Sequence, residues 1–314
     1  MLSATTARTT LRSSRAIRSH PAFHTAHLSS SALPRPRPAQ LPWKLVGAVG
    51  AASVAYAVWQ LKPELLPSPA PLYADAPPSS STWIDPTTQT PFPSTILSPN
   101  GTKLRLVGSG VRTVSFLSIR VYTVAWYVSE KELEAAKQGK LEGWQGYTPE
   151  HLIPPYSLTA GDEKSPVGEE LIDNLLEKAD VAVVIVPLRN TSLGHLRDAF
   201  TRALLARMKV PRVAETMTPE TTEQTGAALI EFKSFFPTKS LHKGSPLELY
   251  YSAVSRTVQV QAKNDKTGAP ETLGTLRNAL LAKELMVSYF SNTTAPSSEL
   301  VKSVAMGFGG EGRP

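Results

Sequence analysis

The stretch from Gly108 to Val128, GSGVRTVSFLSIRVYTVAWYV, constrains the fold more than any other part of the chain. Its β-branched and aromatic residues predict a strand over 111–128, and the glycines before it predict a turn. Side chains of a strand point alternately to its two faces. An unbroken strand would place on one face Arg112, Val114, Phe116, Arg120, Tyr122, Val124 and Trp126.

Arg112 is the first charged side chain of this face. A guanidinium at the edge of an apolar surface suits a flat, anionic, aromatic or acyl ligand, because it can bind a carboxylate through two parallel hydrogen bonds. The alternative is structural, with Arg112 pairing with a carboxylate at a sheet edge. The residues alone leave both interpretations open.

Other segments predict the remaining strands of a sheet. The wholly apolar run Val181–Val186 predicts a buried strand. Two short segments, 247–253 and 256–262, predict an antiparallel hairpin. A further strand is predicted over 227–236.

Helix signals fall between these strands. A capping box at Ser129 and Glu132 predicts a helix to about Lys140. Polar residues at 190–192 are N-cap candidates for a helix over 193–209. Further helices are predicted over 166–179, 272–292 and 297–306. Strand groups interleaved with helices predict an α+β fold, with an antiparallel β-sheet and helices layered on one face.

The net charge of +7 comes from the beginning of the chain. Residues 1–63 contain arginines and lysines but no acidic residue, and the rest of the chain is close to neutral. The folded part therefore offers no basic surface for nucleic acid, and no nucleic-acid partner is expected. Residues 1–40, rich in Ser, Thr, Ala and Arg, are typical of a mitochondrial transit peptide.

Residues 45–61, LVGAVGAASVAYAVWQL, carry no charge and predict a single transmembrane helix of about 25 Å. A buried or merely extended leader segment is the alternative. Basic residues lie mainly before it, which places the N-terminus in the matrix and the following domain in the intermembrane space. Gly47 and Ala51 have the small-residue spacing that allows a dimer through this anchor helix.

Residues 62–94 are dense in Pro and Ser and predict a linker between the inner membrane and the globular domain. That domain is expected over 95–314. The chain contains no cysteine, which excludes disulfides, thiolate zinc sites and a cysteine nucleophile.

Four segments carry a resemblance to a known family: GSGVRT, VYTVAWYV, VPLRNTSLGHLRDAF and GAPETLGTLRNALLAKELMVSYF. Over residues 95–292 the chain resembles the chalcone isomerase fold. Together with the leader, it is similar to the fungal mitochondrial "altered inheritance of mitochondria" proteins that carry a chalcone isomerase domain.

The resemblance implies an isomerase, or intramolecular lyase, that closes a flavanone ring without any required cofactor. Arg112 stands at the catalytic arginine, which stabilises an oxyanion. Tyr122 falls near a catalytic threonine of the family, and Thr275 near a hydroxyl that the last helix supplies. Leu196 and Ala203 replace polar residues of the family, so plant-type activity is not expected.

Three functions stay open. The first is this isomerase, and the second is a non-catalytic protein that binds haem or a fatty acid in the same cleft. The third is a membrane-tethered interaction protein whose site is a relic. The resemblance makes His195 the candidate haem ligand, with an ordinary surface histidine as its alternative. The expected partner is a small hydrophobic or aromatic anionic ligand.

Overall fold

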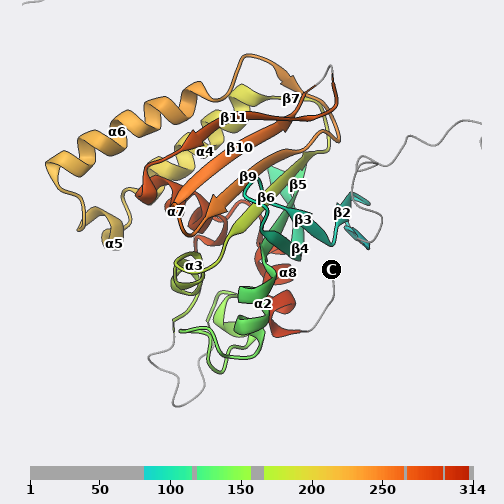
Figure 1. Ribbon diagram of the computed structural model, residues 1–314, viewed down its shortest axis with the longest axis vertical. Helices are drawn as coiled ribbons and strands as arrows, with labels where there is room; N and C mark the ends of the chain where they lie inside the picture. The colour runs from blue at the N-terminus through green and yellow to red at the C-terminus, as the bar shows by residue number, and fades with distance from the viewer. Residues whose placement is uncertain (1–80, 115–118, 157–165, 265–266, 293, 311–314) are drawn as a thin grey trace, which may run out of the picture. The chain divides into compact units, whose positions relative to one another are not determined.

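The computed structural model describes residues 81–114, 119–156, 166–264, 267–292 and 294–310 (Figure 1). The chain divides into two compact units, 1–68 and 69–314, and every described residue belongs to the second. The predicted transit peptide and the predicted membrane span at 45–61 lie outside the described residues. Within those residues, no helix combines the length and the apolar character needed to cross a membrane.

The centre of the domain is a seven-stranded antiparallel sheet with the order β11-β10-β9-β6-β5-β4-β3. Its strands are β3 (Thr95–Leu97), β4 (Lys103–Val114), β5 (Ile119–Ser129), β6 (Val181–Pro187), β9 (Leu247–Ser252), β10 (Thr257–Lys263) and β11 (Pro270–Leu276). Two short pairs accompany it, β1 (Thr82–Ile84) with β2 (Pro91–Pro93), and β7 (Thr191–Ser192) with β8 (Ser240–Leu241). Since β1 and β2 fall inside the predicted linker 62–94, the folded domain begins before residue 95.

The helices pack against one face of this sheet and bury its larger core. They are α2 (Glu130–Lys137), α3 (Glu169–Leu176), α4 (Leu193–Arg207), α5 (Pro211–Ala214), α6 (Pro219–Ser234), α7 (Ala279–Val287) and α8 (Ser298–Gly309), with 3-10 turns η2 (Pro149–His151) and η3 (Ser288–Phe290). A smaller core on the other face includes Phe92 of β2 and Tyr127 of β5. The predicted α+β fold with helices on one face is confirmed.

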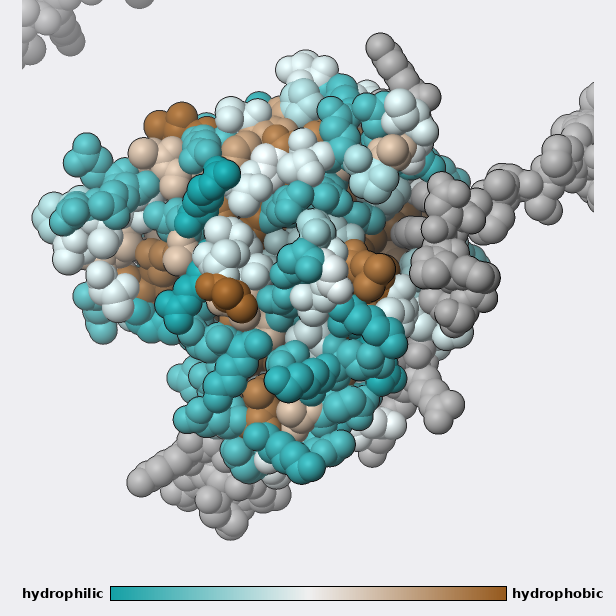
Figure 2. Space-filling model, viewed as in Figure 1, coloured by the Kyte–Doolittle hydropathy of each residue, from teal (hydrophilic) through white to brown (hydrophobic). Residues whose placement is uncertain are grey.

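The surface in view is mainly hydrophilic. Figure 2 shows apolar side chains as small separate patches among polar ones. This face therefore offers no broad apolar area for a partner.

Several predicted elements are confirmed. The apolar run at 181–186 is β6, the predicted hairpin is β9 and β10, and the helix predicted over 193–209 is α4. Other predictions are wrong. The strand predicted over 227–236 lies mostly in α6, and the helix predicted over 272–292 begins as strand β11 and becomes helical only at Ala279.

The strand predicted without a break over 111–128 is two strands. β4 ends at Val114 and β5 begins at Ile119, and the two pair as antiparallel neighbours. The glycines at 108 and 110 lie inside β4 and not in a turn before it.

Those glycines allow α8 to lie directly on β4. A Cβ atom at Gly110 would be 2.2 Å from the backbone nitrogen of Leu300, and one at Gly307 would be 2.0 Å from the carbonyl oxygen of Val107. The amide of Ser109 donates to Ser303 Oγ at 3.0 Å, and the amide of Val111 donates to Glu299 Oε2 at 3.3 Å. Helix α8 therefore fixes the strand segment that leads into Arg112.

A buried ion network joins the helices on the same side of the sheet. Arg207 of α4 is 1 % exposed and Glu284 of α7 is 0 % exposed. Nε of Arg207 donates to Glu284 at 2.8 Å and Nη1 donates to Glu169 of α3 at 2.7 Å. Arg212 of α5 binds the second carboxylate oxygen of Glu284 at 2.7 Å. One carboxylate thus holds two arginines, and the network links four helices.

Candidate functional site

The register of β4 and β5 places Arg112 directly opposite Tyr122. The Arg112 guanidinium donates a hydrogen bond to the Tyr122 phenol oxygen at 3.1 Å, and its Cζ lies 5.5 Å from the ring centroid. Arg112 is half-buried and Tyr122 is buried. Because the phenol oxygen accepts from arginine, its own proton is free for a second partner.

A β-bulge follows Arg112, where the pairing shifts between Arg112 and Thr113. Bulges redirect side chains next to functional sites. Among the described residues, no carboxylate lies within ion-pair distance of Arg112. In this part of the chain the structural alternative, an arginine paired with an acidic side chain, has no support.

Further aromatic side chains lie in the core on the same helix-covered face as Tyr122. The ring of Trp126 lies 6.3 Å from Tyr289 and 4.8 Å from Phe290, measured between centroids. The Tyr289 hydroxyl and Trp126 Nε1 are fully buried and have no hydrogen-bond partner among the described residues. A buried polar atom without a partner is rare in proteins and points to an absent ligand or water.

Burial determines the protonation of both tyrosines. It raises the pKa of Tyr122, while the charge of Arg112 and its hydrogen bond act in the opposite direction. Burial also raises the pKa of Tyr289 well above its usual value, with a further increase from Tyr122 and a decrease from Arg112. At neutral pH both phenols therefore keep their protons. The site combines one permanent positive charge with neutral hydroxyl donors.

The structure does not bring Thr275 to this pair. Thr275 lies on β11 and not on a helix as predicted, because residues 270–276 pair with β10. Strands β10, β9, β6 and β5 separate β11 from β4. At the usual spacing of neighbouring strands, five steps correspond to about 24 Å along the sheet.

His195 lies on the first turn of α4 and is exposed. Its backbone amide donates to the Ser192 Oγ, the helix N-cap, at 3.1 Å. No hydrogen bond or ring contact links its imidazole to Arg112 or Tyr122 in the described part of the chain. Leu196 is buried and Ala203 is half-buried on the same helix, and neither offers a polar group to the site.

The sequence offered Arg112 and Tyr122 as candidates but not Tyr289, which the structure adds to the candidate site. The only signal at Tyr289 is a tyrosine within a mainly apolar segment, LMVSYF. Such a tyrosine usually reaches water or a backbone carbonyl with its hydroxyl. Only the structure shows that the Tyr289 hydroxyl is buried and has no hydrogen-bond partner among the described residues.

The chain resembles two groups of known proteins. It is 28% identical over 240 residues to Altered inheritance of mitochondria protein 18, mitochondrial, of Debaryomyces hansenii, covering 69% of this chain and 72% of that protein. The protein of the same name in Eremothecium gossypii is 27% identical over 234 residues, with 68% and 70% covered. Among solved structures, an Arabidopsis thaliana fatty-acid binding protein aligns with a TM-score of 0.49 and 16% identity, over 74% of this chain and 100% of that one.

The chain also matches a family as a whole. The model of the family described as "Chalcone isomerase like" matches residues 102–305. This range contains β4 and β5 with the Arg112–Tyr122 pair, all helices from α2 to α7, and most of α8. Since well over half of the sequence lies in the match, the chain belongs to the chalcone isomerase-like family.

Proposed function

We propose that this chain binds a molecule that combines a carboxylate with an apolar body, of which a fatty acid is the simplest example. The observation that carries the proposal is the hydrogen bond from the Arg112 guanidinium to the Tyr122 phenol oxygen. It leaves the phenol proton and the remaining guanidinium N–H groups as donors side by side. A carboxylate has two oxygens that only accept, which matches this pair of donors.

The surroundings support a ligand with a large apolar part. Trp126 and Phe290 form an aromatic wall beside Tyr122 and Tyr289 within the main core. The unpartnered hydroxyl of Tyr289 adds a further donor inside this wall. Ligand sites of this kind bury an apolar body and orient it through a few polar groups.

An isomerase is the second candidate, because the same donors would stabilise a developing oxyanion. The proximity of Arg112 and Tyr122 favours it. Against it stand the apolar Leu196 and Ala203, and the position of Thr275 on the far edge strand. Ligand binding without catalysis requires none of these three residues, and we therefore favour it over the isomerase.

Replacing Arg112 with methionine is expected to weaken the binding of dodecanoate to the full chain by roughly 10- to 100-fold. The reason is the loss of a charge-assisted hydrogen bond, worth about 1.5–3 kcal/mol. Tyr122→Phe removes one neutral donor and should weaken binding by roughly fivefold. Calorimetric titration measures both effects.

Arg120→Met is the matched control for this prediction. Arg120 lies on β5, is exposed, and donates to the backbone carbonyl of Thr87 at 3.1 Å. Its removal should leave dodecanoate binding unchanged. Equal losses in the Arg112 and Arg120 variants would show only a general attraction between positive charge and the ligand, and would refute the assignment.

The affinity for dodecanoate is expected to stay nearly constant from about pH 6.5 to 9.5. Burial raises the pKa of Tyr122, so its hydroxyl keeps the proton and continues to donate throughout this range. A decrease in affinity that begins below pH 9 in the native chain, and is absent in Tyr122→Phe, would contradict a protonated Tyr122.

The molecule that co-purifies with the full chain distinguishes the candidates. Mass spectrometry that finds fatty acid in the native chain, and none in Arg112→Met, supports the proposal. A Soret band that disappears in His195→Ala would instead indicate haem. Formation of a flavanone from a chalcone, lost in Arg112→Met, would favour the isomerase.

We also propose that the chain is anchored in the mitochondrial inner membrane, with its domain in the intermembrane space. The acid-free leader, the uncharged segment 45–61 and the mitochondrial names of its relatives support this. Protease added to intact mitochondria should spare the domain, and rupture of the outer membrane should expose it. Protection that persists after rupture would place the domain in the matrix.

A further inference from the structure

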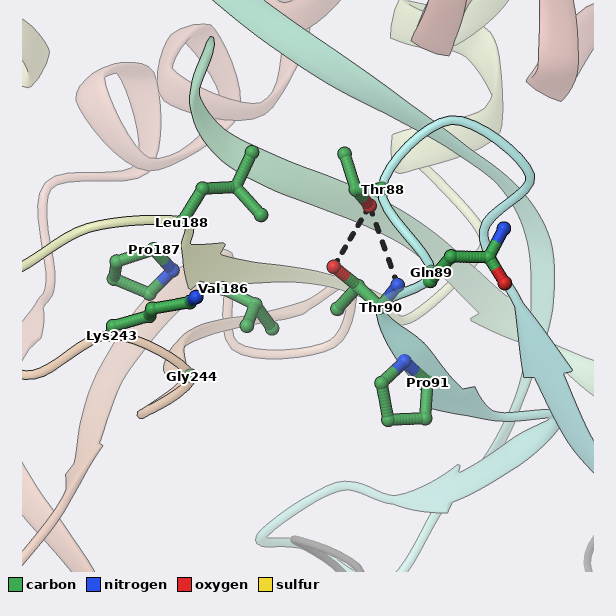
Figure 3. A pocket seen from close by; sticks show the side chains of 9 residues that line it. All are labelled: Thr88, Gln89, Thr90, Pro91, Val186, Pro187, Leu188, Lys243 and Gly244. Atoms are coloured by element: carbon green, nitrogen blue, oxygen red, sulfur yellow. Dashed lines mark hydrogen bonds between the residues drawn. The ribbon is translucent and has the colours of Figure 1, made fainter. Parts of the chain in front are cut away.

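A cavity lies on the opposite face of the sheet from the Arg112 pair. It has a volume of about 190 Å³ and lies between two loops, 88–91 and 243–244, with the end of β6 as its floor (Figure 3). Tyr122 belongs to the helix-covered core, whereas the hydroxyl of its neighbour Thr123 bonds to Thr88 and Thr90 on the other side. The two sites therefore lie back to back across β5.

The first loop is held rigidly by a buried carboxylate. Asp85 is 2 % exposed, and its Oδ1 accepts hydrogen bonds from the amide of Thr88 and from the Thr88 hydroxyl, both at 2.8 Å. Gln89 has φ +58°, a left-handed conformation that is uncommon for residues other than glycine and that concentrates at functional sites. The loop is thus preorganised where it lines the cavity.

This loop presents a hydroxyl to the cavity. The Thr88 hydroxyl donates its single proton to Asp85, so it accepts from Thr90 or from Thr123. When Thr123 fills that role, the proton of Thr90 is directed to Thr123 at 3.1 Å or to Thr88 at 2.8 Å, and a ligand in the cavity would replace one of these acceptors. Figure 3 shows the Thr90 hydroxyl on the side of the loop that faces the cavity.

The second loop contributes a positive charge. The amide of Lys243 donates to Asn190 Oδ1 at 2.9 Å, and the amide of Gly244 donates to the Pro187 carbonyl at 2.9 Å, so the backbone is fixed. The Lys243 side chain extends toward Val186 and the cavity (Figure 3). No carboxylate of the described residues forms an ion pair with its ammonium group. It is the single charged side chain among the residues that line the cavity.

The remaining walls are apolar, since they are formed by Pro91, Val186, Pro187 and Leu188. The volume is close to that of a cavity of about 150 Å³ that holds benzene, a molecule of about six heavy atoms. One charge, one hydroxyl and apolar walls match a monoanion with a short hydrocarbon body. A phosphate would leave most of its oxygens without donors here.

We propose that this cavity is a binding site for short-chain carboxylic acids of about the size of butanoate, with Lys243 binding the carboxylate and Thr90 donating to it. This proposal does not depend on the function assigned to Arg112. Both sites would bind a carboxylate group, and their ligands would differ in the length of the hydrocarbon chain.

Titration of the full chain with sodium butanoate, followed by saturation-transfer NMR, tests the assignment. Lys243→Met keeps most of the length of the side chain and removes its charge, and should weaken butanoate binding roughly tenfold. Thr90→Val should weaken it by a smaller factor. Lys209→Met, at another exposed lysine, is the matched control and should change nothing.

Arg112→Met separates the two sites and is expected to leave butanoate binding intact. An equal loss in Arg112→Met and Lys243→Met, or an equal loss in Lys209→Met, would overturn the proposal. Absence of saturable butanoate binding would overturn it as well. If inorganic phosphate bound as tightly as butanoate, the cavity would attract negative charge alone, and the proposal would also be overturned.

Discussion

Replacing Glu284 with alanine is expected to lower the free energy of unfolding by about 3–5 kcal/mol. The carboxylate is fully buried and accepts from both Arg207 and Arg212. Its removal leaves the Arg207 guanidinium buried with only Glu169 to balance it. A buried charge that loses its partner retains the full penalty of leaving water. Urea unfolding followed by tryptophan fluorescence measures the change.

The control for Glu284 is an ion pair of similar length on the surface. Glu142 binds Lys178 at 2.8 Å, but 86% of the Glu142 side chain is exposed. Exposed pairs contribute about 0–1 kcal/mol, so Glu142→Ala should change stability little. Similar effects of the two substitutions would show that the network at Glu284 is open to water.

Gly110→Ala is expected to destabilise the domain by about 3 kcal/mol or more, at the upper end of the range for overpacked sites. The new Cβ would lie 2.2 Å from the amide nitrogen of Leu300 and 2.7 Å from the carbonyl carbon of Glu299. Both atoms belong to the backbone of α8, so no side chain can rotate away. The helix itself must move from β4, and the packing of its buried face is lost.

Gly226 provides the opposite case. It lies inside helix α6, and a Cβ atom there would meet nothing within 4 Å. Gly226→Ala should therefore stabilise the chain by about 0.5–1 kcal/mol, because alanine has less conformational freedom to lose in a helix. A destabilising effect at Gly226, or a neutral one at Gly110, would contradict the packing described for these helices.

A sequence pattern within one helix or strand was sufficient to predict that element where the pattern did not depend on other parts of the chain. The apolar run at 181–186 had to be a central strand, and β6 is buried along its entire length. The helix of 193–207 carried its own N-cap at Ser192, whose side chain accepts from the amide of His195. These signals are local, so the sequence contains them completely.

The incorrect predictions share a cause: two signals in the sequence favour different secondary structures for the same segment. The aromatic segment before Pro237 resembles a strand, but Thr218 and Pro219 start a helix upstream that continues to Ser234. The segment 270–276 precedes the N-cap Asn278 and becomes a strand because β10 offers an unpaired edge. Pairing with the preceding strand decided that segment, since Lys263 pairs with Pro270 and Val258 pairs with Leu276. The helical spacing of its leucines did not reveal this hairpin.

The contact between Arg112 and Tyr122 follows from the sequence only in part. Alternation along one strand placed Arg112 and Tyr122 on one face, far apart. The structure places them in contact because the chain reverses between Val114 and Ile119 and pairs the two residues. No glycine or proline marks the position of that reversal, so the contact could not be derived from the sequence.

The contacts between α8 and β4 have a consequence for how the protein is made. The amide of Val111 reaches its partner on Glu299 across 188 positions of the chain. A ribosome must therefore synthesise almost the entire domain before the strand next to Arg112 receives its cover. Until then the two glycine positions of β4 stay exposed, and a partly translated chain has no finished ligand site. The site at Arg112 is therefore complete only when α8 is in place on β4.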